Sequence, residues 1–181
     1  SIGIYAEDFA TGTSTGHISV GDKSAAYYAG ADGILNISGT ANIGEESTLL
    51  YAAGGNINYT GSDIVIGNKN IALTLSGTSL VDFNGKNVTV GNEGTGIFIT
   101  GTGDFSGVSN LGDITVGSKG TAVYLDNPAA FISGNNINLM GGESVGIFTT
   151  KNGNINYSGN IVSAGLKAKG IINTGTGNTV N

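Results

Sequence analysis

Seven glycines recur along this chain at an almost constant spacing, and the residues around each glycine recur with it. They are Gly21, Gly44, Gly67, Gly91, Gly117, Gly141 and Gly165, separated by 23, 23, 24, 26, 24 and 24 residues. A fixed period in this range is typical of stacked supersecondary units, in which each repeat buries its apolar side chains against its neighbours. The period favours a protein that provides length and surface over one built around a single reactive pocket.

Each period contains three short segments with the pattern of a β-strand. The first precedes the glycine, as in 88–90, where apolar and polar residues alternate as in a half-buried strand. The second follows the glycine, as in 96–98, and the third ends in a small polar residue and glycine, as in 83–85. Between them lie Gly, Asn, Asp, Ser and Thr, which favour turns.

The sequence therefore predicts an all-β parallel β-helix with three strands per coil, about 23–26 residues per coil and seven to eight coils. Like strands would stack at about 4.8 Å. Helices are disfavoured, because no segment has apolar residues at helical spacing and each of the 33 glycines would cost roughly 1 kcal/mol in a helix. The copies at 137–141 and 161–165 hold one extra residue, which predicts a local bulge.

Composition limits the function further. The chain has no Cys and no Arg, and its 7 Lys stand against 13 acidic residues, giving a net charge of −6. Without Cys the chain has no thiolate ligands for a metal site, and its negative net charge argues against a basic face for nucleic acid. No apolar run approaches the roughly 20 residues of a membrane-spanning helix, and no signal-peptide pattern is present.

The whole chain, residues 1–181, is interpreted as a single β-helix segment of a longer rod. Residues 1–5 already match the second strand of the repeat, and neither end has the polar or helical cap that solenoids use to protect open edges. Such open ends would allow isolated segments to stack end to end.

Short motifs recur in the repeats, namely Ile-Thr-Val-Gly at 114–117, Thr-Gly-Ile-Phe at 95–98, Ser-Val-Gly-Ile-Phe at 144–148 and Gly-Asn-Ile-Asn-Tyr-Ser-Gly at 153–159. They resemble the passenger repeats of the very large autotransporter (type V secreted) adhesins of Gram-negative bacteria, most of all the fusobacterial type. The resemblance covers the whole chain. It implies a right-handed β-helix on the bacterial surface, held in the outer membrane by a barrel outside this chain. It also implies a role in virulence and adhesion to host-cell glycans, host surface proteins or other bacteria, but it assigns no binding residue.

One candidate surface comes from two neighbouring columns of the second strand. The first column is mainly aliphatic and contains Ile4, Tyr27, Leu50, Leu73, Ile97, Val123, Ile147 and Ile171. The second is mainly aromatic and contains Tyr5, Tyr28, Tyr51, Thr74, Phe98, Tyr124, Phe148 and Ile172. Adjacent strand residues face opposite ways, so the aromatic column is external if the aliphatic column forms the core. Alternatively, the rings stack inside the rod together with the preceding Gly/Ala column.

The six rings of this column, Tyr5, Tyr28, Tyr51, Phe98, Tyr124 and Phe148, are the candidate partner-binding site. An external aromatic ladder would suit sugar rings, a protein partner or another part of the same adhesin. A purely structural stack is an equally open interpretation.

Enzyme chemistry is disfavoured. The chain has no Arg and a single histidine, His17, in a predicted turn, and the acidic pairs 7–8 and 45–46 are sequence neighbours. The calcium-binding nonapeptide of β-rolls is missing, and the outward positions of the first strand are too mixed for an ice-binding threonine array. We therefore expect a non-enzymatic adhesin shaft without metal or cofactor, acting as a spacer or binding directly. The alternative is a carbohydrate-binding or carbohydrate-active β-helix protein.

Overall fold

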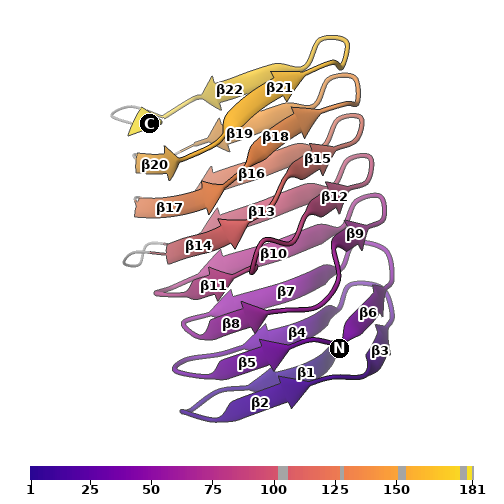
Figure 1. Ribbon diagram of the computed structural model, residues 1–181, viewed down its shortest axis with the longest axis vertical. Helices are drawn as coiled ribbons and strands as arrows, with labels where there is room; N and C mark the ends of the chain where they lie inside the picture. The colour runs from indigo at the N-terminus through magenta and orange to yellow at the C-terminus, as the bar shows by residue number, and fades with distance from the viewer. Residues whose placement is uncertain (102–105, 127–128, 151–153, 176–178, 181) are drawn as a thin grey trace.

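The computed structural model describes residues 1–101, 106–126, 129–150, 154–175 and 179–180. These residues form a parallel β-solenoid of about seven turns, with strands stacked along the rod axis (Figure 1). Its strands assemble into three faces, and the described residues contain no helix. The predicted fold class is confirmed.

The first sheet is an uninterrupted series of eight strands. Its parallel strands are, in order, β1 (Ile2–Ala6), β4 (Ala25–Ala29), β7 (Thr48–Ala53), β10 (Ile71–Ser76), β13 (Thr95–Thr100), β16 (Thr121–Asp126), β19 (Val145–Thr149) and β22 (Lys169–Asn173). Each strand pairs with the strand one period away, so that Leu73 lies between Leu50 and Ile97.

The second sheet repeats this order with the third segment of each period. Its strands are β2 (Thr11–Ser14), β5 (Ile34–Ile37), β8 (Asn56–Tyr59), β11 (Leu80–Asp82), β14 (Ser106–Leu111), β17 (Ala129–Gly134), β20 (Asn154–Tyr157) and β23 (Thr179–Val180). The register shifts between Val108 and Leu111 of β14.

The third face is divided into two sheets. One pairs β3 (His17–Val20) with β6 (Thr40–Ile43), and the other contains β9 (Ile64–Ile66), β12 (Val88–Val90), β15 (Ile114–Val116), β18 (Asn136–Leu139) and β21 (Asn160–Ser163). At the break between β6 and β9, Ala41 is smaller than the branched residues of the other coils, and Leu49 replaces the usual Gly or Ala of the adjacent corner. A small hollow of about 160 Å³ remains there.

The predicted bulges are present. Met140 and Gly141 both donate their N–H groups to the carbonyl of Val116, at 3.2 and 3.1 Å, and Ala164 and Gly165 both donate to Leu139. Two residues thus oppose one, which defines a bulge. The extra residue turns outward, and the Met140 side chain is exposed.

The core is a continuous aliphatic column enclosed by the three faces. Leu50, Leu73, Ile97 and Val123 are fully buried. The preceding corner position also faces inward, where a Cβ added to Gly96 would lie 2.6 Å from the carbonyl oxygen of Ala122. At Gly96 even the Cβ of alanine would be too close, and most other copies of this corner also carry a small residue, Gly or Ala.

Polar ladders connect the coils at the turns between the second and third faces. Asn87 donates its backbone N–H and its side-chain amide to the two carboxylate oxygens of Asp63, both at 3.0 Å. Asn87 in turn accepts from the N–H of Asp113 at 2.8 Å, and Asp113 accepts from the N–H of Asn136 at 3.0 Å. The two hydrogen bonds from Asn87 to Asp63 hold the pKa of the Asp63 carboxyl below its ordinary value of 3.8, and the backbone bond has the larger effect.

Truncation of a buried leucine and truncation of an exposed leucine should differ greatly in their effect on stability. Leu73→Ala should destabilise the protein by about 2–5 kcal/mol, because it leaves a cavity between stacked coils. Leu166→Ala, at a site that is 79 % exposed, should change stability by no more than about 0.5 kcal/mol. Chemical denaturation of both variants measures the difference, and equal losses would contradict the placement of the core.

The Asp63 ladder predicts a dependence on acid. A carboxylate whose pKa is lowered by folding stabilises the protein above its unfolded pKa, and this contribution is lost as pH falls through the folded pKa. Asp63→Asn should therefore lower the melting temperature near pH 7. The gap in melting temperature between the variant and the unmodified protein should shrink as pH falls below about 4. A gap that stays constant between pH 7 and pH 3 would refute the ladder's electrostatic role.

Candidate functional site: an aromatic ladder on the first sheet

The aromatic column forms two stacks of three rings. Tyr5 and Tyr28 are 5.2 Å apart between ring centroids and Tyr28 and Tyr51 also 5.2 Å, with interplanar angles of 18° and 8°. In the second stack Phe98–Tyr124 and Tyr124–Phe148 are separated by 5.1 and 5.2 Å, at 37° and 21°. The rings follow the coil spacing because the strands that carry them pair in register.

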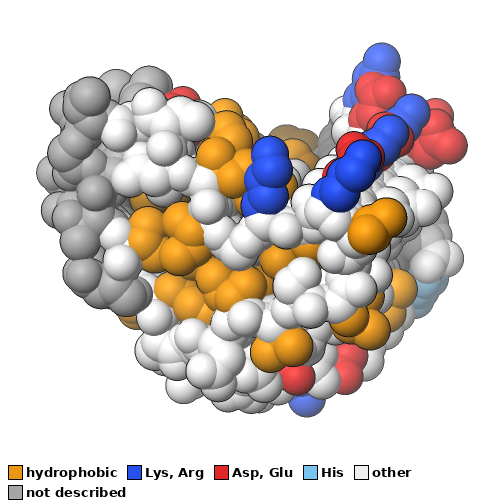
Figure 2. Space-filling model, turned by 90° about the horizontal axis from the view of Figure 1, so that it is seen from above, with side chains coloured by type: hydrophobic (Ala, Val, Ile, Leu, Met, Phe, Trp, Pro, Cys, Tyr) orange, Lys and Arg blue, Asp and Glu red, His pale blue; other side chains and the backbone are white. Residues whose placement is uncertain are grey.

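The ladder lies on the outside of the rod. Leu50 and Ile97 are fully buried, whereas their neighbours Tyr51 and Phe98 are partly exposed. The inward-facing corner residues accompany the aliphatic column, so of the two packing alternatives the structure has the external one. Figure 2 shows hydrophobic side chains next to a ridge where acidic and basic side chains gather.

Thr74 interrupts the ladder. It pairs with Tyr51 on one side and Phe98 on the other, and it is only 4 % exposed. The column therefore consists of a tyrosine triplet on β1, β4 and β7 and a Phe-Tyr-Phe triplet on β13, β16 and β19. Thr74 on β10 separates the two triplets.

Stacking determines what the rings can offer a partner. Each ring inside a triplet covers the faces of its neighbours, so the outward surface consists mainly of ring edges and tyrosine hydroxyls. A sugar ring packs on an aromatic face, whereas a flat protein surface can pack along edges. Tyr5, the outermost ring of its triplet, is 48 % exposed.

The hydroxyls of Tyr5 and Tyr28 stay protonated over the physiological range, because both have a raised pKa. A hydrogen bond to the Glu7 carboxylate, with desolvation and repulsion from the same group, raises the pKa of Tyr5 to about 12. Desolvation raises the pKa of Tyr28, with further contributions from Tyr51 and Glu7. This end of the ladder therefore presents neutral hydroxyl groups beside a carboxylate.

A separate hollow that the sequence did not indicate lies on the second sheet. It has a volume of about 490 Å³ and is lined by Phe9, Asp32, Ile34, Gly54, Asn56, Thr78 and Leu80. Phe9 is 81 % exposed, and its φ of 65° is unusual for a bulky residue. Turn residues carry no strand periodicity, so only the backbone conformation reveals how Phe9 is presented.

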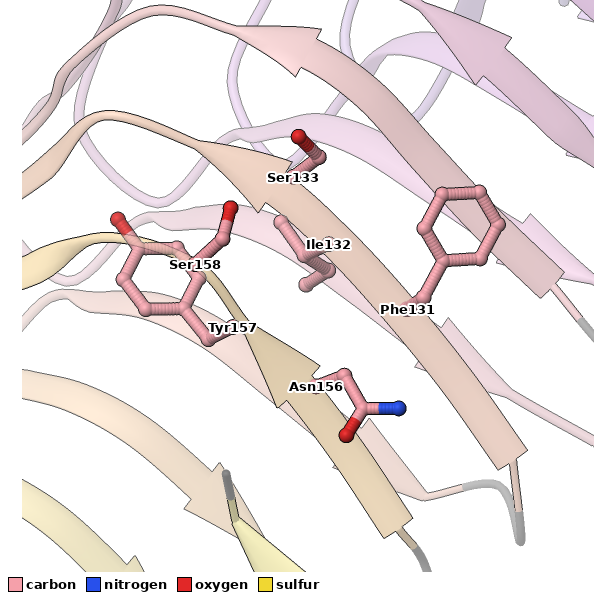
Figure 3. Close-up of a pocket in the computed structure, with 6 residues that line it drawn as sticks. All are labelled: Phe131, Ile132, Ser133, Asn156, Tyr157 and Ser158. Carbon is pink, nitrogen blue, oxygen red and sulfur yellow. The ribbon is translucent and has the colours of Figure 1, made fainter.

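Another hollow, of about 400 Å³, lies farther along the same sheet between β17 and β20 (Figure 3). Phe131 and Ile132 come from β17, and Asn156 and Tyr157 from β20. A Cβ on Gly107 would overlap the ring of Phe131, so glycine in the neighbouring coil is what lets this ring lie flat.

The residues considered for enzyme chemistry are dispersed. His17 is exposed and its Nδ1 lies 2.8 Å from the hydroxyl of Thr40. Glu45 and Glu46 are exposed on a turn, where Glu46 pairs with Lys23 at 3.5 Å. The described residues contain no group of three or more His, Asp or Glu that could hold a metal ion. In the same residues, no helix has the length and apolarity to cross a membrane.

Comparisons of the chain with protein-family models, curated proteins and solved structures give no significant match. The fold and the sites above therefore stand on the sequence and the structure alone.

The interruption at Thr74 predicts a stabilising substitution. Thr74→Tyr should join the two triplets and raise stability by about 1–3 kcal/mol, since it adds two aromatic pairs that contribute roughly 0.5–1.5 kcal/mol each. Thr89→Tyr is the matched control, because Thr89 is an exposed strand residue whose neighbours are Val65 and Thr115. Thermal melts that show no advantage of Thr74→Tyr over Thr89→Tyr would contradict an external, in-register ladder.

Proposed function

We propose that this chain is a segment of the shaft of a bacterial cell-surface adhesin of the autotransporter type. The shaft acts outside the cell, without catalysis, and presents or contributes binding sites for host cells or partner bacteria. The observation that carries this proposal is the unbroken first sheet, in which the same strand recurs in eight successive coils. The short motifs that recur in the repeats support the assignment to surface adhesins.

A rod of this kind converts chain length into reach. Seven steps of about 4.8 Å separate the first and last strands of the first sheet, a distance of roughly 34 Å. Added repeats would extend the rod at a nearly constant gain in burial per coil. The regular turns and continuous core support the role of a spacer.

The aromatic ladder supports a direct contribution to binding. Its edges and hydroxyls form a stripe parallel to the rod axis, which suits a flat protein partner on a host cell or on another bacterium. We assign the protein-contact role to Tyr5, Tyr28, Tyr51, Phe98, Tyr124 and Phe148 under this proposal.

A second candidate function is carbohydrate binding, and it is favoured by the hollow beside Phe9. Unlike the stacked rings, Phe9 has no aromatic partner among the described residues and offers its ring face to solvent. The polar residues Asp32, Asn56 and Thr78 line the same hollow. An apolar ring face surrounded by hydrogen-bonding groups suits a neutral sugar.

A binding screen of the isolated segment distinguishes protein contact from carbohydrate binding. The segment would be tested against host cells, partner bacteria and a glycan array. Binding to cells that survives removal of their glycans supports the protein-contact role of the ladder, and binding to neutral glycans supports the hollow. A segment that binds neither surface nor glycan acts as a spacer, and the direct-binding part of the proposal fails.

Replacement of Tyr28, Tyr51 and Tyr124 by alanine tests the ladder directly. Loss of these rings removes four stacked pairs, so the melting temperature should fall by several degrees while the far-UV circular dichroism at 25 °C stays unchanged. Cell binding should fall at least tenfold. Leu166→Ala, at an exposed residue outside both candidate surfaces, is the control and should leave cell binding intact. The ladder has no binding role if the triple variant binds cells as well as the unmodified protein.

A further inference from the structure

The turns between the third face and the first sheet carry a charged residue two positions after each repeating glycine. The seven residues are Lys23, Glu46, Lys69, Glu93, Lys119, Glu143 and Lys167. All seven are exposed, and all have a left-handed backbone with φ between 52° and 59°. They form one column along the rod, which we call the charge ladder, and it contributes to the ridge of acidic and basic side chains in Figure 2.

The backbone at these positions favours glycine. A left-handed φ is strained for a residue with a Cβ, whereas glycine adopts it freely. This chain has 33 glycines, and the turns themselves contain several, yet none occupies the left-handed position of the charge ladder. Strain that recurs in seven coils indicates that the side chains at these positions have a role.

The charges alternate in sign without exception from Lys23 to Lys167. Hydrogen bonds align the turns, since the N–H of Glu93 donates to the carbonyl of Ser118 and the N–H of Lys119 to that of Gly142, both at 2.9 Å. Within the described residues, Lys23 and Glu46 form the one ion pair closer than 4.0 Å. The ladder therefore acts mainly through the charges of successive coils, one coil step apart, and less through individual contacts.

Apolar packing alone does not distinguish one coil from the next. Ile66, Val90 and Val116 occupy the same core position of the third face and are all buried. If β15 stacked directly on β9, with the coil between them looped out, similar aliphatic side chains would still meet. Repeat proteins are prone to this kind of misassembly.

We propose that the charge ladder is a register code that opposes the omission of a coil during folding. In the native stack every charge has opposite charges above and below it. Omission of one coil places like on like, for example Lys119 on Lys69. Omission of two coils restores opposite charges, but it sacrifices two coil interfaces and closes a longer loop. The alternation thus opposes the omission of a single coil, which is the error that would otherwise cost the least free energy.

A cysteine pair reports the omission directly, because the chain has no cysteine of its own. Val65 and Thr115 lie on β9 and β15 with Thr89 of β12 between them. Two coil steps place their Cα atoms about 9.6 Å apart, beyond the roughly 7 Å that a disulfide spans. In the folded protein, a disulfide in Val65→Cys/Thr115→Cys therefore forms within one chain only when the intervening coil is omitted, whereas Val65→Cys/Thr89→Cys reports the native register.

The test is refolding of the Val65→Cys/Thr115→Cys protein from denaturant under mild oxidation, at low protein concentration. Lys119→Glu makes Lys69 attract residue 119 and should raise the fraction of this disulfide several-fold at low salt. Lys119→Gln, which removes the charge alone, should raise it less. Inversion of all seven charges preserves the alternation and should leave the fraction at its original level. Salt at about 1 M should remove these differences, because it screens charges beyond about 3 Å.

Two results would overturn the proposal: an equal disulfide fraction in Lys119→Glu and Lys119→Gln, or a raised fraction in the fully inverted ladder. A second measurement is independent of refolding yield. Glu93→Lys places lysine at three successive positions of the charge ladder, 69, 93 and 119. Asp32→Lys makes the same change of charge at an exposed residue with φ 56° outside the ladder. Glu93→Lys should melt about 2–6 °C lower than Asp32→Lys at low salt, and equal melting temperatures would also refute the code.

Discussion

Parallel hydrogen bonding between strands one period apart is the constraint on which the rest of this structure depends. A short strand of two to six residues cannot satisfy its own N–H and C=O groups, so each coil takes its partners from the coils before and after it. The same pairing places equivalent side chains above one another, so that the repeated pattern becomes aliphatic, aromatic, amide and charged columns. Fold and candidate surfaces thus have one origin.

The columns differ in what stacking does to them. Aliphatic side chains gain burial, and asparagine and aspartate gain hydrogen bonds from the next coil, as Asp63 does from Asn87. Aromatic rings gain stacking but cover their own faces. Charges are the exception, because identical charges repel at this spacing. Alternation of lysine and glutamate solves this problem, and strain at the left-handed position is tolerated for it.

Much of the fold follows from the sequence because the period and the strand pattern are both local signals. The repeating glycines indicate the coil length, and the extra residues near Met140 and Ala164 indicate the bulges. The sequence predicted outward-facing rings only on the condition that the aliphatic column forms the core. It did not settle this condition, since the direction of the Gly/Ala corner depends on how the first and third faces meet. The break between β6 and β9 coincides with Ala41 and Leu49, which lie on different faces, and pairs of residues across faces carry no periodic signal.

The candidate surfaces were harder to predict from the sequence than the fold. The exposure of Phe9 depends on the left-handed turn that carries it, which no residue type there requires. The charge ladder did have a signal, namely the residue two positions after each repeating glycine, but its meaning depends on the left-handed backbone and on the vertical alignment of the turns. An adhesin shaft would draw its length from the coil stack and its contacts from these outer columns.

The distance between two labels four coils apart tests the stack most directly. Val65 and Val162 are exposed and are linked through the register of Thr89, Thr115 and Asn138. Four steps of about 4.8 Å place their Cα atoms roughly 19 Å apart. Pulsed electron paramagnetic resonance of the doubly labelled protein should give a single narrow distribution around this distance, allowing for the label arms. A distribution centred one coil step shorter, or one beyond about 30 Å, would contradict the in-register solenoid.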